Sequence, residues 1–361
     1  MATQNVDFLI VGQGLAGSLL SYHLLEQGCS VRVINTQQHR PSASRAAAGL
    51  YNPITGRKLV KTWRADDLFP YLETCYTELQ QRLNASFFHP TPIYRPLASV
   101  EDQNEWAVQS DNPAFADFVE EVTLKSRYGN LVHDEHGGLL LRQCGYVNVP
   151  ELLRAYRHFL LEQNLYEESV FDFAQLEVQA CGVRYQDWTA RRVIFCEGAS
   201  AAHNPFFSWL PFRPVKGEML LIRTETPLPV IMNRGVFVIP ESNLYQGRQC
   251  RVGSTYDHHD LSEKATEWAR QTLQQKIEQL LVISYEILDQ WVGVRPATRD
   301  RLPFVGIHPE HEPLGFFGGF GSKGVSLAPY FARHFVHCLL KNKSVDEEVD
   351  IRRYYPKHYP S

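Results

Sequence analysis

The stretch Phe8-Leu9-Ile10-Val11-Gly12-Gln13-Gly14-Leu15-Ala16-Gly17 decides the fold of this chain. Its four apolar residues form a continuous run, which is typical of a strand buried on both faces. The glycines follow the spacing G-x-G-x-x-G, and the segment 15–26 continues with apolar residues at helical spacing. In such a turn the first glycine makes the bend, the second admits a pyrophosphate and the third lets helix and strand pack closely. We therefore predict dinucleotide binding here, with a glycine-rich turn of another α/β fold as the alternative.

The second strand departs from the usual dinucleotide-binding pattern. Residues 31–34 read Val-Arg-Val-Ile, and a strand–helix–strand unit of this length makes a right-handed parallel crossover. The end of this strand usually carries Asp or Glu for the adenosine ribose, but here Asn35 and Thr36 follow it. Asparagine hydrogen-bonds a ribose hydroxyl as a neutral group. The first turn therefore leaves FAD and a nicotinamide cofactor both open.

Composition narrows the class of protein. The chain has 361 residues, 44% of them hydrophobic and 21% charged, which is enough for two joined globular domains. The net charge of −4 argues against a broad polyanion-binding surface. Seven scattered cysteines without a CxxC pair indicate reduced thiols in a cytoplasm. Because no apolar stretch reaches the roughly 20 residues of a spanning helix, we expect a soluble, cytoplasmic protein without a membrane span.

The remaining patterns predict interleaved domains. Helices are expected over 66–83, 150–163, 261–281 and 328–340, and β structure over 87–141 and 214–256, with short strands near 169–171 and 192–196. We therefore expect an α/β fold. Its Rossmann-like dinucleotide-binding domain would comprise residues 1–85, 145–213 and 285–361, and a mainly antiparallel β domain for substrate would comprise 86–144 and 214–284.

Two C-terminal stretches distinguish between the cofactors. Residues 291–306 read WVGVRPATRDRLPFVG, and residues 318–329 read GGFGSKGVSLAP. Together they resemble the D-amino-acid oxidase superfamily of flavoenzymes, in which the first stretch flanks the flavin and the second opens a helix beside it. The chain resembles the glycine and sarcosine oxidase branch, and also the FAD domain of the bifunctional tRNA wobble-uridine modification enzyme. The resemblance implies an FAD-binding domain beside a β substrate domain.

The resemblance assigns FAD contacts along the whole chain. They are Gly12, Gly14, Leu15, Ala16 and Gly17 in the first turn; Asn35 and Thr36; Ser44, Arg45, Ala48, Gly49 and Leu50 in a small-residue loop under the flavin; Val170; Cys196, Glu197 and Gly198; Arg295; and Gly319, Gly321, Ser322, Lys323, Gly324, Val325 and Ser326 in the second turn. Glu197 is unusual at its position. Free N–H groups where the last helix begins would stabilise the negative charge of reduced flavin.

Three residues are candidate catalytic groups. Arg295 matches the arginine with which glycine oxidases hold the substrate carboxylate, and a guanidinium fork suits that task. The alternative for Arg295 is a structural ion pair with Asp300. Lys323 would add positive charge beside the flavin, or would simply face solvent. Tyr245 would close the pocket, with Tyr256 as the second tyrosine considered for this role.

Two departures refine these assignments. Glycine oxidases carry a second arginine in the second turn, where this chain has Ser322 and Lys323, so glycine itself is doubtful as the substrate. Gly293 stands where sarcosine oxidases carry the cysteine that binds flavin covalently, so we expect non-covalent FAD.

The expected activity is oxidation of the C–N bond of a small primary or secondary amine or amino acid. Hydride would pass to flavin N5, water would hydrolyse the imine, and oxygen or another acceptor would reoxidise the flavin. A rival substrate is a carboxymethylaminomethyl-type group on tRNA, which a basic group in the N-terminal part of the chain would face. That group comprises Arg45, Arg57, Lys58, Lys61 and Arg64. If the chain does not catalyse a reaction, it would be a non-catalytic flavin-binding subunit. If it does not bind flavin, it would bind NAD(P) at the first turn.

A cluster of potential metal ligands occurs at residues 133–136, His-Asp-Glu-His. Two glycines follow it directly, so we interpret the cluster as a solvated hairpin turn and expect no metal.

Overall fold

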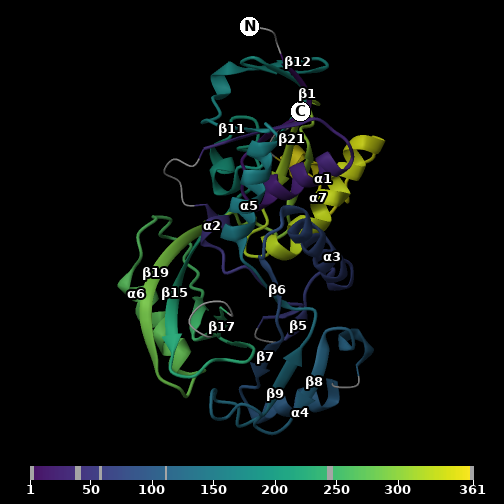
Figure 1. Ribbon diagram of the computed structural model, residues 1–361. Coiled ribbons are helices and arrows are strands. Elements are labelled where there is room, and N and C mark those ends of the chain that lie inside the picture. Colours follow the sequence, from purple (N-terminus) through teal and green to yellow (C-terminus); the bar gives the residue numbers. More distant parts are fainter. Residues whose placement is uncertain (1–3, 37–41, 57–58, 110–111, 242–246, 358–361) are drawn as a thin grey trace.

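The chain folds into two regions, one around a parallel sheet and one around a mainly antiparallel sheet (Figure 1). The computed structural model describes residues 4–36, 42–56, 59–109, 112–241 and 247–357.

The first sheet contains eight strands from distant parts of the chain. They are β1 Gln4–Val11, β2 Val31–Asn35, β11 Tyr166–Glu168, β12 Leu176–Gln179, β13 Gly182–Tyr185, β14 Trp188–Phe195, β20 Phe304–Ile307 and β21 Leu314–Gly318. The order runs β11-β2-β1-β14, and β14 then pairs with β13 through its first half and with β21 through its second half. From β11 to β21 these pairings are parallel. The interleaved Rossmann-like arrangement is therefore confirmed.

The apolar run of β1 is buried on both faces, as its sequence predicts. Phe8 and Ile10 pack into one hydrophobic cluster, while Leu9 and Val11 pack into another on the opposite face. A strand covered on both sides has no polar face, which is why its sequence does not alternate.

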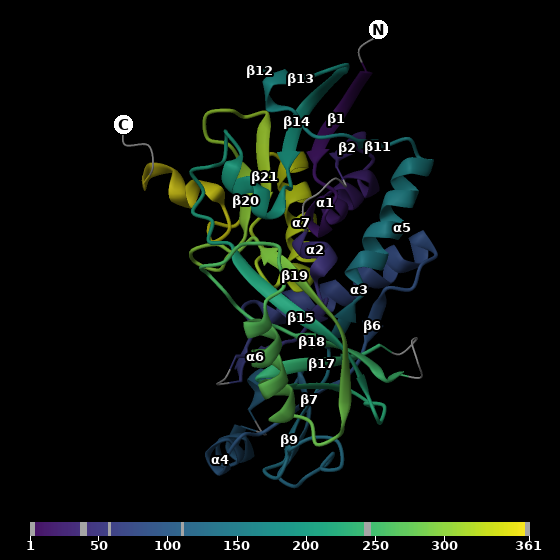
Figure 2. The ribbon, with the colours of Figure 1, turned by 90° about the vertical axis from the view of Figure 1, so that its left-hand side faces the viewer.

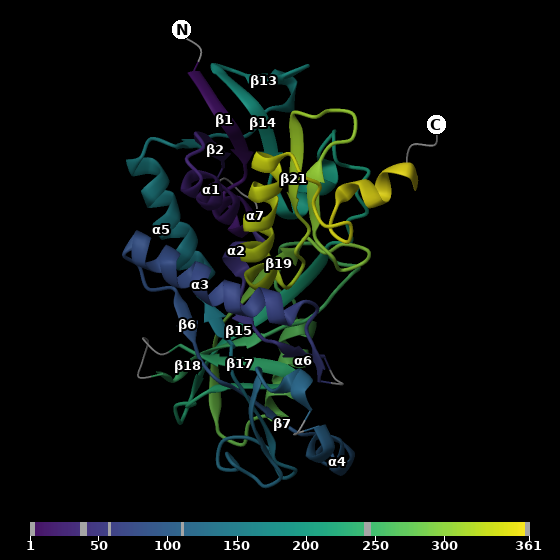
Figure 3. The same cartoon turned by 90° about the vertical axis from the view of Figure 1, so that its right-hand side faces the viewer.

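Three helices cover one face of this sheet: α1 Leu15–Glu26, α5 Val149–Glu162 and α7 Gly324–Lys341. A fourth helix, α3 Ala65–Leu83, packs on α5 and α7, and a single turn, α2 Ala43–Ala46, lies between α5 and the second sheet. Helix α7 packs against both α1 and α3, so the last helix of the chain lies beside the first (Figure 3).

The second sheet also contains eight strands. They are β7 Ile93–Pro96, β8 Val119–Thr123, β9 Gly138–Leu141, β15 Val215–Thr224, β16 Ile231–Arg234, β17 Val236–Pro240, β18 Gln249–Gly253 and β19 Tyr285–Arg295. Their order is β19-β15-β18-β17-β16-β7-β9-β8, and the β7–β16 pair is parallel whereas the remaining pairs are antiparallel. Helix α6, Glu267–Glu278, packs against β15 and β17 on the outer face of this sheet (Figure 2).

Short strands connect the two regions. β3 Leu50–Tyr51, β6 Phe88–Pro90 and β10 Gly145–Val147 form a three-stranded sheet, and β4 Ile54–Thr55 pairs with β5 Val60–Lys61. Their side chains join the hydrophobic cluster that lies under α1 and α7.

Several element bounds differ from the sequence prediction. Helix α4, Val100–Gln109, lies in a segment predicted as β structure, and the strand expected at 169–171 is β11, which ends at Glu168. The helix expected from 261 begins only at Glu267, because buried Glu218 accepts hydrogen bonds from both the backbone N–H and the hydroxyl of Thr266. This tertiary contact fixes the helix start at a position that local periodicity does not reveal.

Strand pairing bears on the domain boundaries. Strand β19 pairs with β15 along its length, so residues 285–295 belong by hydrogen bonding to the second sheet rather than to the domain predicted from 285 onward. A boundary near residue 296 fits this pairing better. The remaining boundaries stay a prediction.

None of the helices in the described ranges combines the length and the apolar character that crossing a membrane requires.

Candidate active site

The first glycine turn has no room for side chains. Gly12 has φ +103°, and a Cβ there would lie 2.6 Å from the carbonyl oxygen of Cys196. A Cβ on Gly17 would lie 1.9 Å from the carbonyl oxygen of Gly12. Helix α1 can therefore start directly against β1 and β14 only because both positions are glycine.

The small-residue loop lies against this turn. The hydroxyl of Ser44 accepts a hydrogen bond from the backbone N–H of Leu15 at 3.1 Å, and a Cβ on Gly14 would lie 3.3 Å from that oxygen. Ala48 and Gly49 are buried, and Gly49 has φ +77° with the carbonyl oxygen of Val147 1.8 Å from its ideal Cβ position. The loop thus approaches the start of α1 with backbone and small side chains, as the resemblance implies, while Arg45 is exposed.

A second helix starts beside the first. Gly319 and Gly321 have φ +73° and +54°, and α7 begins at Gly324 with Lys323 as its N-cap residue. The ideal Cβ position of Gly324 lies 3.5 Å from Cδ2 of Leu15, so the N-termini of α1 and α7 are adjacent. Ser326 is buried, and the carbonyl oxygen of Val325 accepts a hydrogen bond from the Tyr76 hydroxyl.

Two adjacent helix N-termini create a positive potential suited to a diphosphate. The first-turn N–H groups have no partner within their own helix, and the glycines leave space for backbone to approach a ligand. The residues present therefore fit FAD at this position. Lys323 is exposed at the start of α7, and its pKa is lowered by partial desolvation and then by the charge of Arg301.

The predicted adenosine end lies where β2, β11 and β14 end. The side-chain oxygen of Asn35 accepts the backbone N–H of Gln13 at 2.9 Å, which ties the strand end to the glycine turn. Thr36 follows Asn35 directly. Val170 follows β11, and its side chain is 64% exposed.

Glu197 acquires a structural explanation. Cys196 is buried and continues from β14, and Gly198 has φ +58°. The carboxylate of Glu197 accepts a hydrogen bond from the side-chain amide of Asn204 at 2.6 Å, and Asn204 in turn accepts the backbone N–H of Phe206. Glu197 thus orders the turn that follows the strand.

Arg295 lies at the end of β19 on the side of the second sheet. Its guanidinium donates to the Ser254 hydroxyl at 2.6 Å and to the Thr255 carbonyl at 3.1 Å, and it lies 4.3 Å from the centre of the Tyr256 ring. Burial lowers its pKa from the usual value for arginine, and Tyr256 opposes that shift. Within the described ranges, no carboxylate forms an ion pair with Arg295.

The partner expected for Arg295 in a structural ion pair is engaged elsewhere. Asp300 forms an ion pair with Arg353 at 3.0 Å and accepts the Tyr354 hydroxyl at 2.8 Å. The proposed Arg295–Asp300 ion pair is therefore wrong.

Gly293 faces the small-residue loop across the two regions. A Cβ at this position would lie 2.6 Å from the Cβ of Ala46, and the neighbouring Trp291 donates its indole N–H to the Ala46 carbonyl at 3.1 Å. Neither the cysteine of sarcosine oxidases nor any larger side chain fits at 293 without a shift. This geometry agrees with non-covalent FAD.

The second sheet contributes charged residues that the sequence did not single out. Arg251 on β18 forms an ion pair with Glu241 at 2.7 Å and donates to the Ala48 carbonyl at 3.2 Å. Lys216 on β15 is buried, and its ammonium donates to Asp260 at 2.6 Å and to the Lys264 carbonyl at 2.7 Å. These pairs form only once strands β15, β17 and β18 come together, so the sequence alone did not reveal them.

The structure describes part of the basic group and does not describe the first tyrosine candidate. Lys61 pairs with Asp66, and Arg64 pairs with Asp67 and Asp346, so these two cations of the basic group are compensated. Arg57, Lys58 and Tyr245 lie outside the described residues.

The His133–His136 turn is ordered by its own buried aspartate. The carboxylate of Asp134 accepts hydrogen bonds from the Tyr94 and Ser126 hydroxyls and from two backbone N–H groups. This network accounts for the carboxylate without a metal ligand role.

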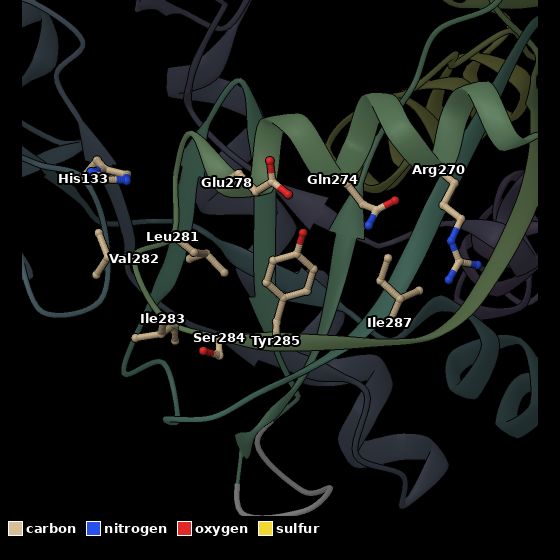
Figure 4. Close-up of a pocket in the computed structure, with 10 residues that line it drawn as sticks. All are labelled: His133, Arg270, Gln274, Glu278, Leu281, Val282, Ile283, Ser284, Tyr285 and Ile287. Atoms are coloured by element: carbon tan, nitrogen blue, oxygen red, sulfur yellow. The ribbon is translucent and has the colours of Figure 1, made fainter.

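A separate groove of about 760 Å³ lies between α6 and the beginning of β19 (Figure 4). Glu278, Gln274 and Arg270 of α6 point from the helix toward Tyr285 and Ile287 of β19. At about 3.3 Å per strand residue, Tyr285 lies roughly 30 Å from Arg295 at the opposite end of β19. The groove is therefore separate from the candidate active site.

Glycine turns open the two adjacent helices α1 and α7, and Arg295 lies on a separate β-sheet. This arrangement defines the class of protein as a dinucleotide-dependent enzyme with a second, substrate-binding domain. The sequence comparisons specify the family. The model of the DAO family, described as FAD dependent oxidoreductase, matches residues 7–337, and the chain belongs to this family. It is thus an FAD-dependent oxidoreductase.

Individual relatives are distant. The chain is 26% identical over 360 residues to the bifunctional protein ThiO/ThiG of Nostoc sp., covering 94% of this chain but 53% of that protein. It is 26% identical over 354 residues to the glycine oxidase of Pseudomonas putida, covering 92% and 93% of the two chains. The chain therefore spans about half the length of the first relative and nearly all of the second.

Solved structures share the fold. The glycine oxidase of Geobacillus kaustophilus superposes with a TM-score of 0.77 at 21% identity, over 95% of this chain and 97% of that one. The iminodiacetate oxidase of Chelativorans sp. superposes with a TM-score of 0.77 at 18% identity, over 96% of this chain and 98% of that one.

Proposed function

We propose that this chain oxidises the C–N bond of a small amine that carries a carboxylate, that is, an amino acid or an N-substituted amino acid. The observation that carries the proposal is Arg295, a half-buried arginine without a carboxylate partner among the described residues, on the strand that packs against the small-residue loop.

The hydrogen bonds of Arg295 leave it able to bind a further acid. A guanidinium has five N–H donors in a fixed plane. Three contacts with protein oxygens are made, to Ser254, Thr255 and, at 3.4 Å, the Lys216 carbonyl. These fix the plane of the group from one side, and the remaining donors suit a carboxylate oxygen pair.

Electrostatics favours the same ligand. Partial burial strengthens the field of Arg295, which no acid in the described part of the chain pairs with, because the surrounding dielectric is lower than that of water. A substrate carboxylate would supply the missing negative charge, and a neutral amine of the same shape would not. Arg295 would thereby orient the substrate so that its C–N bond lies on the side of Gly293 and Ala46.

The remaining residues of the site position the cofactor. When bound, FAD supplies the acceptor for the two electrons and two protons that leave the C–N bond, and water hydrolyses the resulting imine. Positive potential from the start of α7, with Lys323, favours negative charge at that place. Trp291 and Arg251 hold the carbonyls of Ala46 and Ala48, so the loop that approaches the cofactor is fixed from the second sheet.

Relatives that act on amino acids support the substrate class. The glycine oxidase of Pseudomonas putida matches nearly the full length of the chain, and the iminodiacetate oxidase shares the fold. Because the identities are low, the particular amino acid follows from neither.

The test is an anaerobic screen that follows bleaching of the flavin absorbance. Glycine, sarcosine and further N-alkyl amino acids are compared with amines of the same shape that lack the carboxylate, such as methylamine and dimethylamine. We expect bleaching by at least one acid and none by its decarboxylated partner. The Arg295→Met variant, with Arg299→Met on the exposed side as control, should raise the apparent dissociation constant of that acid about a hundredfold.

Rival functions give different results in the same screen. A yellow protein that no amine bleaches would favour a non-catalytic flavin-binding subunit. If an amino acid and its decarboxylated amine bleached the flavin equally, Arg295 would not be part of the substrate site. Retarded migration of tRNA at physiological salt, with no response to small amines, would favour the tRNA-linked substrate.

A further inference from the structure

The end of β2 carries an amide where dinucleotide-binding folds usually carry an acid for the adenosine ribose. Both ends of this amide are engaged. The Asn35 oxygen accepts the backbone N–H of Gln13 at 2.9 Å, and its nitrogen donates to the Tyr166 hydroxyl at 3.2 Å. Asn35 therefore holds the glycine turn and the neighbouring strand, and a single acceptor site of its amide oxygen is left beside the bond from Gln13.

The hydrogen bonds continue to a carboxylate on the neighbouring strand. Strands β2 and β11 are parallel, with Glu168 opposite Asn35 in the register. The Tyr166 hydroxyl donates to Glu168 at 2.6 Å. Because register partners in adjacent strands project from the same face of a sheet, Glu168 stands on the face where the side chain of residue 35 projects.

Glu168 also differs from the acid next to it. Glu167 projects to the opposite face, where it forms an ion pair with Arg32 at 3.2 Å. Glu168 is exposed, whereas Tyr166 beneath it is buried. Burial, followed by the hydrogen bond with Glu168, raises the pKa of Tyr166 to about 12, so the tyrosine stays a neutral donor to the carboxylate.

We propose that Glu168 is the carboxylate that binds the ribose hydroxyls in the adenosine half of FAD, in place of the acid missing at residue 35. It lies at the carboxyl ends of the parallel strands, where ligands of such sheets bind. A cis-diol presents two donors, and a carboxylate has acceptor sites for both even while it accepts the Tyr166 hydroxyl. Asn35, with a single acceptor site left on its amide oxygen, does not have a site for each hydroxyl.

The order of the hydrogen bonds gives each residue a separate task. Gln13 belongs to the diphosphate turn, Asn35 and Tyr166 connect that turn to β11, and Glu168 ends the series at the ribose. The inference depends on FAD binding, which the family establishes, and not on the proposed substrate.

The experiment measures binding of FAD and of its 2′-deoxyadenosine analogue to the apoprotein by quenching of flavin fluorescence. In the unmodified protein, FAD should bind about tenfold more tightly than the analogue, as expected for a hydrogen bond to a charged group. Glu168→Gln should raise the dissociation constant of FAD about tenfold and abolish the preference for FAD over the analogue. Glu167→Gln should leave that preference unchanged.

A purely structural role predicts another result. If Glu168 only anchors Tyr166, Glu168→Gln would weaken FAD and the analogue equally, and the preference would survive. That outcome, or an unchanged dissociation constant for FAD, would overturn the proposal.

A reciprocal exchange provides a second test that does not depend on loss of binding. Asn35→Asp alone should weaken FAD binding, because two carboxylates then face each other across the strand pair. Combining Asn35→Asp with Glu168→Gln should recover both affinity and preference, because one carboxylate again meets the diol. Failure of the double variant to recover the preference, with thermal unfolding unchanged, would contradict the exchange.

Discussion

The nucleotide side of this molecule, which is the first sheet with its helices, and the substrate side, which is the second sheet, are built by different means. Around the start of α1, shape is set by backbone contacts so close that Gly17 and Gly49 leave no space for a methyl group. Across the interface, the strands β15, β18 and β19 carry Lys216, Arg251 and Arg295, whose positions depend on ion pairs and side-chain hydrogen bonds. The comparison teaches that the glycine turns are shaped by contacts between backbone atoms, whereas the charged residues of the second sheet are held by contacts between side chains.

The largest effect should follow from breaking the nucleotide side. Gly17→Ala places a methyl group 1.9 Å from the Gly12 carbonyl oxygen, so α1 must move away from β1. We expect loss of bound flavin absorbance and a loss of about 5 kcal/mol or more in unfolding free energy.

The matched control separates steric clash from general intolerance of the glycine-to-alanine change. Gly28→Ala replaces a glycine whose φ is +75°, but no atom lies within 4 Å of its ideal Cβ position. It should cost about 1 kcal/mol and retain FAD. Equal losses in the two variants would contradict the assignment of a steric role to Gly17.

A change on the substrate side should lower stability without affecting FAD binding. Lys216→Met leaves Glu218 buried without its neighbouring ammonium at 3.6 Å and releases Asp260. We expect the free energy of unfolding in denaturant to fall by about 3 kcal/mol, because an uncompensated buried charge remains. Binding of FAD at low denaturant should be unchanged, since Lys216 lies on the second sheet.

The double variant sharpens this result. Lys216→Met with Glu218→Gln removes both charges and should recover part of the stability. If Lys216→Met released FAD while the protein stayed folded, the separation of the two sides would be wrong.

What the sequence predicted follows the same division. The strand β1, the helices α1 and α7 and both glycine turns were predicted, because each depends on residues close together in the chain. The partners of Lys216 and Arg251 were not, since they come from segments that meet only in the second sheet. The start of α6 was also missed: Thr266 is its N-cap residue, and Glu218, 48 positions away, accepts two hydrogen bonds from Thr266.

A smaller effect should depend on pH and belongs to the nucleotide side. His23 on α1 is buried against Tyr71 and Cys75 of α3, and burial, followed by the charge of Arg333, lowers its pKa to about 4. Because the unfolded chain takes up a proton near pH 6.5 and the folded chain does not, stability is lost as the pH falls from 6.5 towards 4. Between pH 7 and pH 5 the loss should be about 2 kcal/mol.

Denaturant unfolding of His23→Gln at both pH values checks this assignment. The variant should lose about 2 kcal/mol less than the unmodified protein over that interval. His158→Gln, at an exposed position of α5, controls for the effect of the His-to-Gln change itself. A His23→Gln variant with unaltered pH dependence would show that different groups cause the acid sensitivity.

The smallest effect should test whether the substrate side depends on a ring as well as on charge. Tyr256 is 59% exposed and lies over Arg295, and a cation–π contact at an exposed site contributes about 0.5–1 kcal/mol. Tyr256→Leu should raise the Michaelis constant of the carboxylate substrate two- to fivefold, by about that free energy, with FAD binding unchanged. Tyr256→Phe keeps the ring and should behave like the unmodified protein. If Phe and Leu raise the constant equally, the hydroxyl rather than the ring acts on the substrate, and the position of Arg295 would depend on its hydrogen bonds to Ser254, Thr255 and Lys216.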